Sequence, residues 1–92
     1  MMSTGTSADS FSALLRRYRR GGGLTQEALA ERVGLSVRGV QHLEAGDARP
    51  FTATIEALEA ALDLAADDRE RLRAAVRADA HRHTSANAPT RF

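Results

Sequence analysis

The side chains that could carry out chemistry in this 92-residue chain are its histidines, carboxylates and glycine-rich stretch. The three histidines, at 42, 81 and 83, have neither cysteine nor a tight carboxylate cluster beside them to complete a metal-ligand set. The glycines at 21–23 lack the lysine and the preceding strand of a phosphate-binding loop. The remaining candidates are carboxylates that fall largely on outer positions of predicted helices, where solvation explains them: Glu56, Glu59, Asp63, Asp67, Asp68 and Glu70. We therefore expect no enzyme, no catalytic residue, no metal and no cofactor.

Charge is distributed unevenly along the chain. Residues 1–51 carry a net charge of +2, residues 52–81 carry −3 and residues 82–92 carry +2, and every basic residue is an arginine. A basic front half is expected of a protein that presents one face to a polyanion. No apolar run approaches the roughly 18 residues of a membrane span, and no secretion signal is recognisable. We expect a cytoplasmic protein that has no membrane partner.

Apolar spacing predicts five helices and no sheet. Apolar residues recur at intervals of three and four in five segments, and no useful alternating stretch is present. Thr25 and Ser36 can cap the second and third segments, and Pro50 precedes a fourth segment that starts near 52. The fifth starts near 66. The sequence thus predicts an all-α fold in one domain over residues 9–81, with disordered segments at 1–8 and 82–92.

Two short predicted helices joined by three residues occupy positions 25–46. Ala30 is small enough for the second of these helices to cross closely above it, and Gly34 permits a positive φ at the bend. Val40 and Leu43 anchor the second helix on the core. These anchors leave four side chains facing outward: Val37, Arg38, Gln41 and His42. This is the arrangement of a helix-turn-helix.

The residues of this segment resemble the XRE family of Cro/C1-type repressors. The matching pattern is Leu24-Thr25-Gln26, Leu29-Ala30, Gly34-Leu35-Ser36, Val40, Leu43-Glu44, Gly46 and Pro50. The similarity covers roughly residues 11–64. The fifth helix resembles that of actinobacterial members, where such a domain often leads a much larger regulatory protein. The resemblance implies a five-helix, lambda-repressor-like DNA-binding domain.

The resemblance also implies a role for individual residues. The helix over residues 37–45 would enter the major groove of double-stranded DNA, with Arg38 pairing with guanine and Val37 contacting a thymine methyl group. Gln41 and His42 would lie one turn further along the same face and complete the set of base contacts. The DNA backbone would be contacted by four other residues: Thr25, Gln26, Ser36 and Arg49. Arg19 and Glu44 would form a partly buried ion pair with a structural role.

Three residues depart from the family pattern and keep a second function open. Gly39 costs about 1 kcal/mol relative to alanine inside a helix, Ala45 lacks a polar side chain for phosphate, and Asp47 puts an anion in the loop that usually faces DNA. The first hypothesis is a sequence-specific transcriptional regulator, acting as a homodimer or with a larger protein partner. The alternative is a protein–protein interaction module that uses the same fold as an adaptor in a larger complex.

Several further side chains carry weaker expectations. Tyr18 completes the apolar stripe of the first helix and is expected to pack on the core. Phe51 is expected to be partly buried. Arg16 and Arg20 are open to either DNA or solvent.

Overall fold

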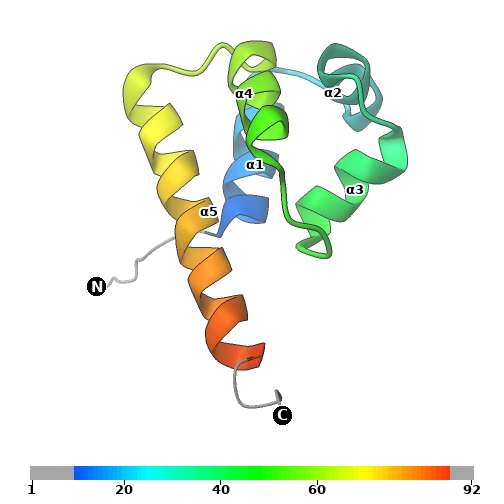
Figure 1. Cartoon of the computed structure of the whole chain (residues 1–92). Coiled ribbons are helices and arrows are strands. Elements are labelled where there is room, and N and C mark those ends of the chain that lie inside the picture. Colours follow the sequence, from blue (N-terminus) through cyan, green and yellow to red (C-terminus); the bar gives the residue numbers. More distant parts are fainter. Residues whose placement is uncertain (1–9, 88–92) are drawn as a thin grey trace, which may run out of the picture.

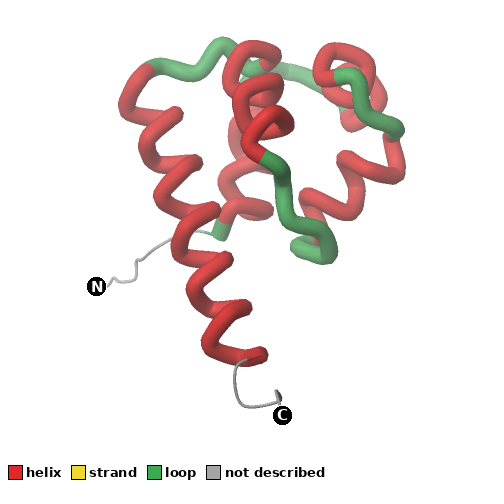
Figure 2. The backbone as a smooth tube through the Cα atoms, viewed as in Figure 1, coloured by secondary structure: helices red, strands yellow, loops and turns green. Residues whose placement is uncertain are grey.

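Five helices form the part of the chain that the computed structural model describes, residues 10–87 (Figure 1 and Figure 2). They are α1 (Phe11–Gly21), α2 (Gln26–Val33), α3 (Val37–Ala45), α4 (Thr52–Ala61) and α5 (Ala66–Asn87). No strand occurs within these residues, which confirms the predicted all-α class. The expected disordered segment 1–8 and the end of the expected tail, 88–92, lie outside the described residues.

Helix α1 lies between α3 and α5. It packs against α3 on one side and α5 on the other, while α2 contacts both α3 and α4 (Figure 1). Each helix, or the turn leading into it, contributes apolar side chains to one core: Phe11, Leu14, Leu15, Leu29, Ala30, Val40, Leu43, Leu58, Leu64, Leu72 and Ala75. Tyr18 is half-buried against this core. The burial of these apolar side chains holds the five helices together.

The ends of the first three helices are fixed by hydroxyl caps and glycines. The side-chain oxygens of Ser10, Thr25 and Ser36 each accept the backbone N–H three residues further on, at 3.2, 3.0 and 3.0 Å. Gly34 and Gly46 end α2 and α3 with φ of 75° and 83°. Residues with a side chain are strained in this left-handed region, so glycine lets the chain leave each helix sharply.

Helix α5 is longer than the sequence analysis predicts. It begins at Ala66, as expected, but continues to Asn87, past the predicted domain end at 81 (Figure 1). Residues 82–87 contain no glycine and no proline, and Pro89 is the first residue that opposes continuation of the helix. A helix rather than a disordered tail therefore occupies 82–87.

Polar contacts attach α5 to both ends of α1. The backbone N–H of Phe11 donates to Oδ2 of Asp79 at 3.1 Å, and the Tyr18 hydroxyl donates to Oδ1 of Asp68 at 3.3 Å. The Asp79 carboxylate lies at the N-terminus of α1, where the helix dipole favours an anion. Helix α5 thus supplies part of the N-terminal cap of α1.

An ion pair between a buried carboxylate and an exposed arginine joins α4 to α5. Glu59, which we expected among the solvated carboxylates, is only 4% exposed, and that expectation is wrong. Arg73 donates to both of its oxygens, from Nε at 2.7 Å and from Nη2 at 2.8 Å. These hydrogen bonds hold the pKa of Glu59 below its ordinary value of 4.5, against the opposite effect of burial. The carboxylate is therefore charged in the folded protein at neutral pH.

This pair predicts an acid-sensitive contribution to stability. Because the folded-state pKa of Glu59 is lowered, its stabilising effect is present above about pH 4.5 and is lost as the pH falls through the folded-state value. We expect the variant Glu59→Gln to melt below the wild type at about pH 7, and the difference in melting temperature to shrink by about pH 3. Thermal melts followed by circular dichroism measure both values. A difference that is the same at the two pH values would contradict the assignment.

Candidate nucleic-acid interface

The turn between α2 and α3 sets the angle of the exposed helix. The carbonyl oxygen of Ala30 accepts the backbone N–H groups of both Gly34 and Leu35, the latter at 3.0 Å. Ala30 is buried, and Val40 and Leu43 of α3 are buried in the same core. Helix α3 is consequently fixed along one face, and its other face is turned away from the core.

A buried ion pair lies where α1, α2 and α3 meet. Arg19 donates from Nε to Oε2 of Glu44 at 2.5 Å and from Nη2 to Oε1 at 3.1 Å. The exposed fractions of the two residues are 9% and 4%. The third guanidinium nitrogen, Nη1, donates to the backbone oxygen of Leu24 at 2.9 Å. The fork geometry of arginine matches a carboxylate in this bidentate manner, and the pair fixes the end of α3 to α1.

The guanidinium group of Arg16 is hydrogen-bonded to the end of α3. Its Nη1 donates to the backbone oxygen of Glu44 in the last turn of α3. A cation there also compensates the negative end of the helix dipole. Arg16 is thus half-buried with one guanidinium nitrogen bound inside the protein, whereas Arg20 is exposed.

Gln26 connects the buried ion pair to the exposed face of α3. Its Nε2 donates to Oε1 of Glu44 at 3.0 Å, and its Oε1 accepts from Nε2 of Gln41 at 3.4 Å. Gln26 is half-buried and Gln41 is exposed. The sequence analysis assigned Gln26 to the DNA backbone and did not anticipate this connection, because no local pattern relates residues so far apart in the chain.

The four side chains expected on the outer face of α3 differ in exposure. Arg38, Gln41 and His42 are exposed, but Val37 is half-buried and packs against the core. Arg38 has no polar partner within the described residues. Nδ1 of His42 lies 3.7 Å from Oδ2 of Asp47, which places an anion beside the C-terminal end of this face.

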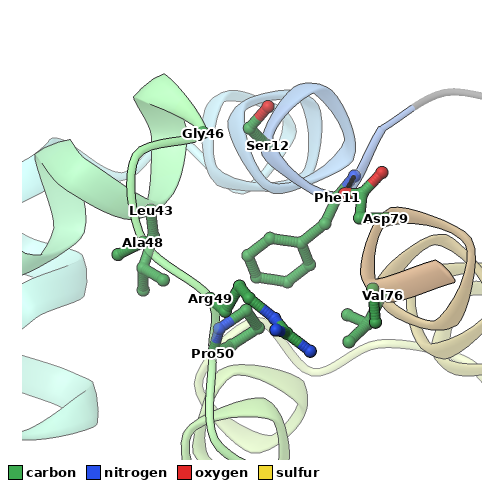
Figure 3. A pocket seen from close by; sticks show the side chains of 10 residues that line it. Phe11, Ser12, Leu43, Gly46, Ala48, Arg49, Pro50, Val76 and Asp79 are labelled. Atoms are coloured by element: carbon green, nitrogen blue, oxygen red, sulfur yellow. Dashed lines mark hydrogen bonds between the residues drawn. The ribbon is translucent and has the colours of Figure 1, made fainter. Parts of the chain in front are cut away.

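The other three residues that we expected to contact the DNA backbone lie in different parts of the structure. Thr25 and Ser36 are exposed, and each hydroxyl oxygen already accepts a helix N–H, which leaves the hydroxyl hydrogen free to donate. Arg49 is exposed in the loop between α3 and α4. Its side chain extends beside the ring of Phe11 toward Val76 of α5, along a hollow lined by α1, this loop and α5 (Figure 3).

Phe51 is the one large apolar side chain that is exposed within residues 10–80. It is 80% exposed, which corrects the expected partial burial. It stands at the start of α4 beside a shallow apolar hollow whose other walls include Leu35, Leu43, Ala48 and Pro50. This hollow reaches His42 and Gly39, so it borders the outer face of α3.

One comparison with known proteins identifies the family. The model of the helix-turn-helix domain family matches residues 10–72, which span α1 to α4 and the start of α5. The chain therefore belongs to the helix-turn-helix domain family, a class of DNA-binding domains. No curated protein and no solved structure shows significant similarity to it. No helix among the described residues is long and apolar enough to cross a membrane.

The buried ion pair predicts a large effect of removing one partner. Glu44→Ala leaves the Arg19 guanidinium buried without its counter-ion, and we expect the free energy of unfolding to fall by about 3–5 kcal/mol. Urea denaturation at neutral pH measures this change. Glu31→Ala, which removes an exposed carboxylate from α2, is the matched control and should change stability little. Equal losses of unfolding free energy in the two variants would contradict the structural role assigned to Glu44.

Proposed function

We propose that this protein is a sequence-specific DNA-binding transcriptional regulator of the XRE, Cro/C1 type. In this proposal α3 enters the major groove of double-stranded DNA, and the protein acts in the cytoplasm. The supporting observation is that α3 has one buried face and one exposed face. The buried face packs in the core through Val40, Leu43 and Glu44. The exposed face carries side chains that a partner can contact: Arg38, Gln41 and His42.

Arg38 is the side chain best suited to read a base. It lies in the first turn of α3 and is exposed, and it makes no polar contact within the described residues. A guanidinium group recognises guanine by two parallel hydrogen bonds to O6 and N7. Val37 keeps part of its surface exposed and can contact a thymine methyl group. His42 completes the set one turn further on.

Contacts to the DNA backbone would position α3 in the groove. The hydroxyl hydrogens of Thr25 and Ser36 can donate to phosphate oxygens while the oxygens remain helix caps. The first N–H groups of α2 point out of the helix, where phosphate binds readily. Arg49 is exposed and has no polar partner within the described residues, so its guanidinium is available to a phosphate.

Gly39 supports the use of this face for close binding. A Cβ atom at this position would make only ordinary contacts, 3.4 Å from Oγ of Ser36 and 3.8 Å from Cβ of Leu35. Neither the backbone conformation nor the packing requires glycine, although glycine weakens a helix by about 1 kcal/mol relative to alanine. A missing side chain beside Arg38 lets a partner approach the backbone of α3 closely.

A single α3 contacts too few base pairs for high affinity. Two copies bound about 34 Å apart on one face of the duplex would double the contacts and match a palindromic site. We therefore propose that the protein binds as a homodimer or together with a larger protein partner.

Phe51 favours a second candidate function, that of an adaptor module for another protein. Exposed phenylalanine beside an apolar hollow is typical of protein interaction sites. Asp47 in the adjacent loop and Ala45 at the end of α3 offer nothing to a phosphate. If no DNA sequence binds preferentially, this candidate becomes the better explanation of the exposed surface.

Selection from a pool of random duplexes tests the proposed function. We expect the protein to enrich a defined sequence, and the affinity for that sequence to fall steeply with salt because neutralised phosphates release counter-ions. Fluorescence anisotropy at several salt concentrations measures the slope. Failure to enrich any sequence would reject the proposal, as would binding that is insensitive to salt.

Arg38→Ala separates base reading from general attraction to DNA. We expect the preference for one base pair of the selected site to relax, with a loss of about 1–3 kcal/mol on the selected sequence. Arg77→Ala removes the same charge from an exposed position on α5 and is the matched control. The control should retain the full sequence preference. If both variants bind every sequence as the wild type does, Arg38 does not face the bases.

A further inference from the structure

Gly39 and Phe51 line the same apolar hollow, between α3 and the start of α4. The lining also includes Leu43 and Pro50. On the α3 side the hollow stays open because Gly39 has no side chain, although a Cβ atom at this position would make only ordinary contacts. On the α4 side stands Phe51, whose surface is 80% exposed. A protruding aromatic ring and an unfilled apolar hollow are therefore adjacent on one surface.

A surface with these two features is able to pair with itself. In a two-fold symmetric pair the same patch meets on both copies, so each patch must supply what the other one needs. Each copy of this chain can place its Phe51 ring in the hollow of the other. Both rings and both hollows are then buried at once, whereas an unrelated protein would need a ring and a hollow of its own to bury the same surface.

The charges around the hollow also suit a second copy. His42 and Arg49 line it, and Nδ1 of His42 lies 3.7 Å from Oδ2 of Asp47. A carboxylate thus stands beside two basic side chains. A rim of like charges would repel an identical rim, whereas a rim of mixed charges lets two copies approach. The carboxylate of Asp47 contributes nothing to a contact with DNA phosphates.

We propose that Phe51 and this hollow form the contact between two copies of the chain. The proposal rests on the DNA-binding function proposed above, which needs two copies about 34 Å apart. Because Gly39 and His42 belong to α3 as well as to the hollow, a contact made there keeps the α3 helices of both copies next to the contact. Gly39 has a role in this arrangement, since a larger side chain would fill the hollow.

The expected strength of this contact follows from its size. An aromatic side chain buries about 150–250 Å², and stable interfaces bury about 1,600 Å² in total. One ring from each copy supplies only part of that area. We expect free copies to associate with a dissociation constant of about 0.1–1 mM. On one duplex with two binding sites, the copies are held at a high effective concentration and the same contact becomes effective.

Two variants, each removing one half of the contact, test association without DNA. Phe51→Ala removes the ring, and Gly39→Leu fills the hollow. Because Phe51 is exposed and Gly39 has space for a side chain, both variants should fold, which circular dichroism checks. Sedimentation equilibrium should show that each variant raises the dissociation constant of the wild type by about tenfold or more. Ala53→Leu, at an exposed position of α4 outside the hollow, is the control and should associate like the wild type.

Mixing the two variants tests whether the insertion is reciprocal. Phe51→Ala retains the hollow and Gly39→Leu retains the ring, so a mixed pair has one intact contact. We expect an equimolar mixture to contain several-fold more dimer than either variant alone at the same total concentration. A contact with a different protein, or a general loss of folding, would give no such recovery.

DNA with one or two copies of the selected sequence tests the use of the contact. On the duplex with two sites, the second wild-type copy should bind about tenfold or more tightly than the first. Phe51→Ala should lose this cooperativity and keep the affinity of the wild type for a single site. The control Ala53→Leu should keep both properties.

Each result decides between the occupants of the hollow. A wild type that stays monomeric up to about 1 mM would overturn the proposal and favour a different protein as the partner. A mixture of the two variants that contains no more dimer than either alone would also overturn it. A weaker affinity of Phe51→Ala for a single site would assign the hollow to DNA instead. If the copies associate as described but no DNA sequence is enriched, the contact between copies stands and the proposed DNA-binding function fails.

Discussion

The Glu44 carboxylate is buried where three helices meet, and an ion in such a place must be compensated by its neighbours. Arg19 supplies the counter-charge from α1, and Gln26 supplies a further donor from the start of α2. Arg16 binds the backbone oxygen of the same residue. The orientation of α3 relative to α1 and α2 is therefore maintained by directional contacts as well as by apolar packing.

A second set of polar contacts makes α5 an integral part of the domain. Glu59 of α4 is bound by Arg73, and the first N–H of α1 is bound by Asp79. A core built from leucine, valine, alanine and a single phenylalanine in so short a chain contributes modest stability. The ion pair fixes α5 to α4, and the shared cap fixes α5 to the start of α1, so both add directional contacts to the apolar packing of α5.

The sequence predicts the helices well because local signals determine them. Hydroxyl caps, glycines at the ends of α2 and α3 and apolar spacing lie within a few residues of the features that they produce. The burial of Glu59 was also open to prediction, since Ile55, Leu58, Glu59 and Leu62 are spaced as one helical stripe. Its partner Arg73 was not, because that contact depends on how α5 crosses α4. The same holds for the contact between Gln26 and Gln41 and for the exposure of Phe51, which depend on the packing of whole helices.

Arg38 and Gln41 lie one turn apart on α3 but differ in how they are held. Arg38 has no polar contact within the described part of the chain, whereas Gln41 is connected through Gln26 to a buried charge. A substitution at position 38 therefore changes the outer surface alone, while a substitution at 41 leaves an amide oxygen of Gln26 in need of a new donor. No polar contact within the described residues therefore restricts the side chain at position 38. The side chains at positions 26, 41 and 44, in contrast, are connected by hydrogen bonds, so a substitution at one of them changes the contacts of the next.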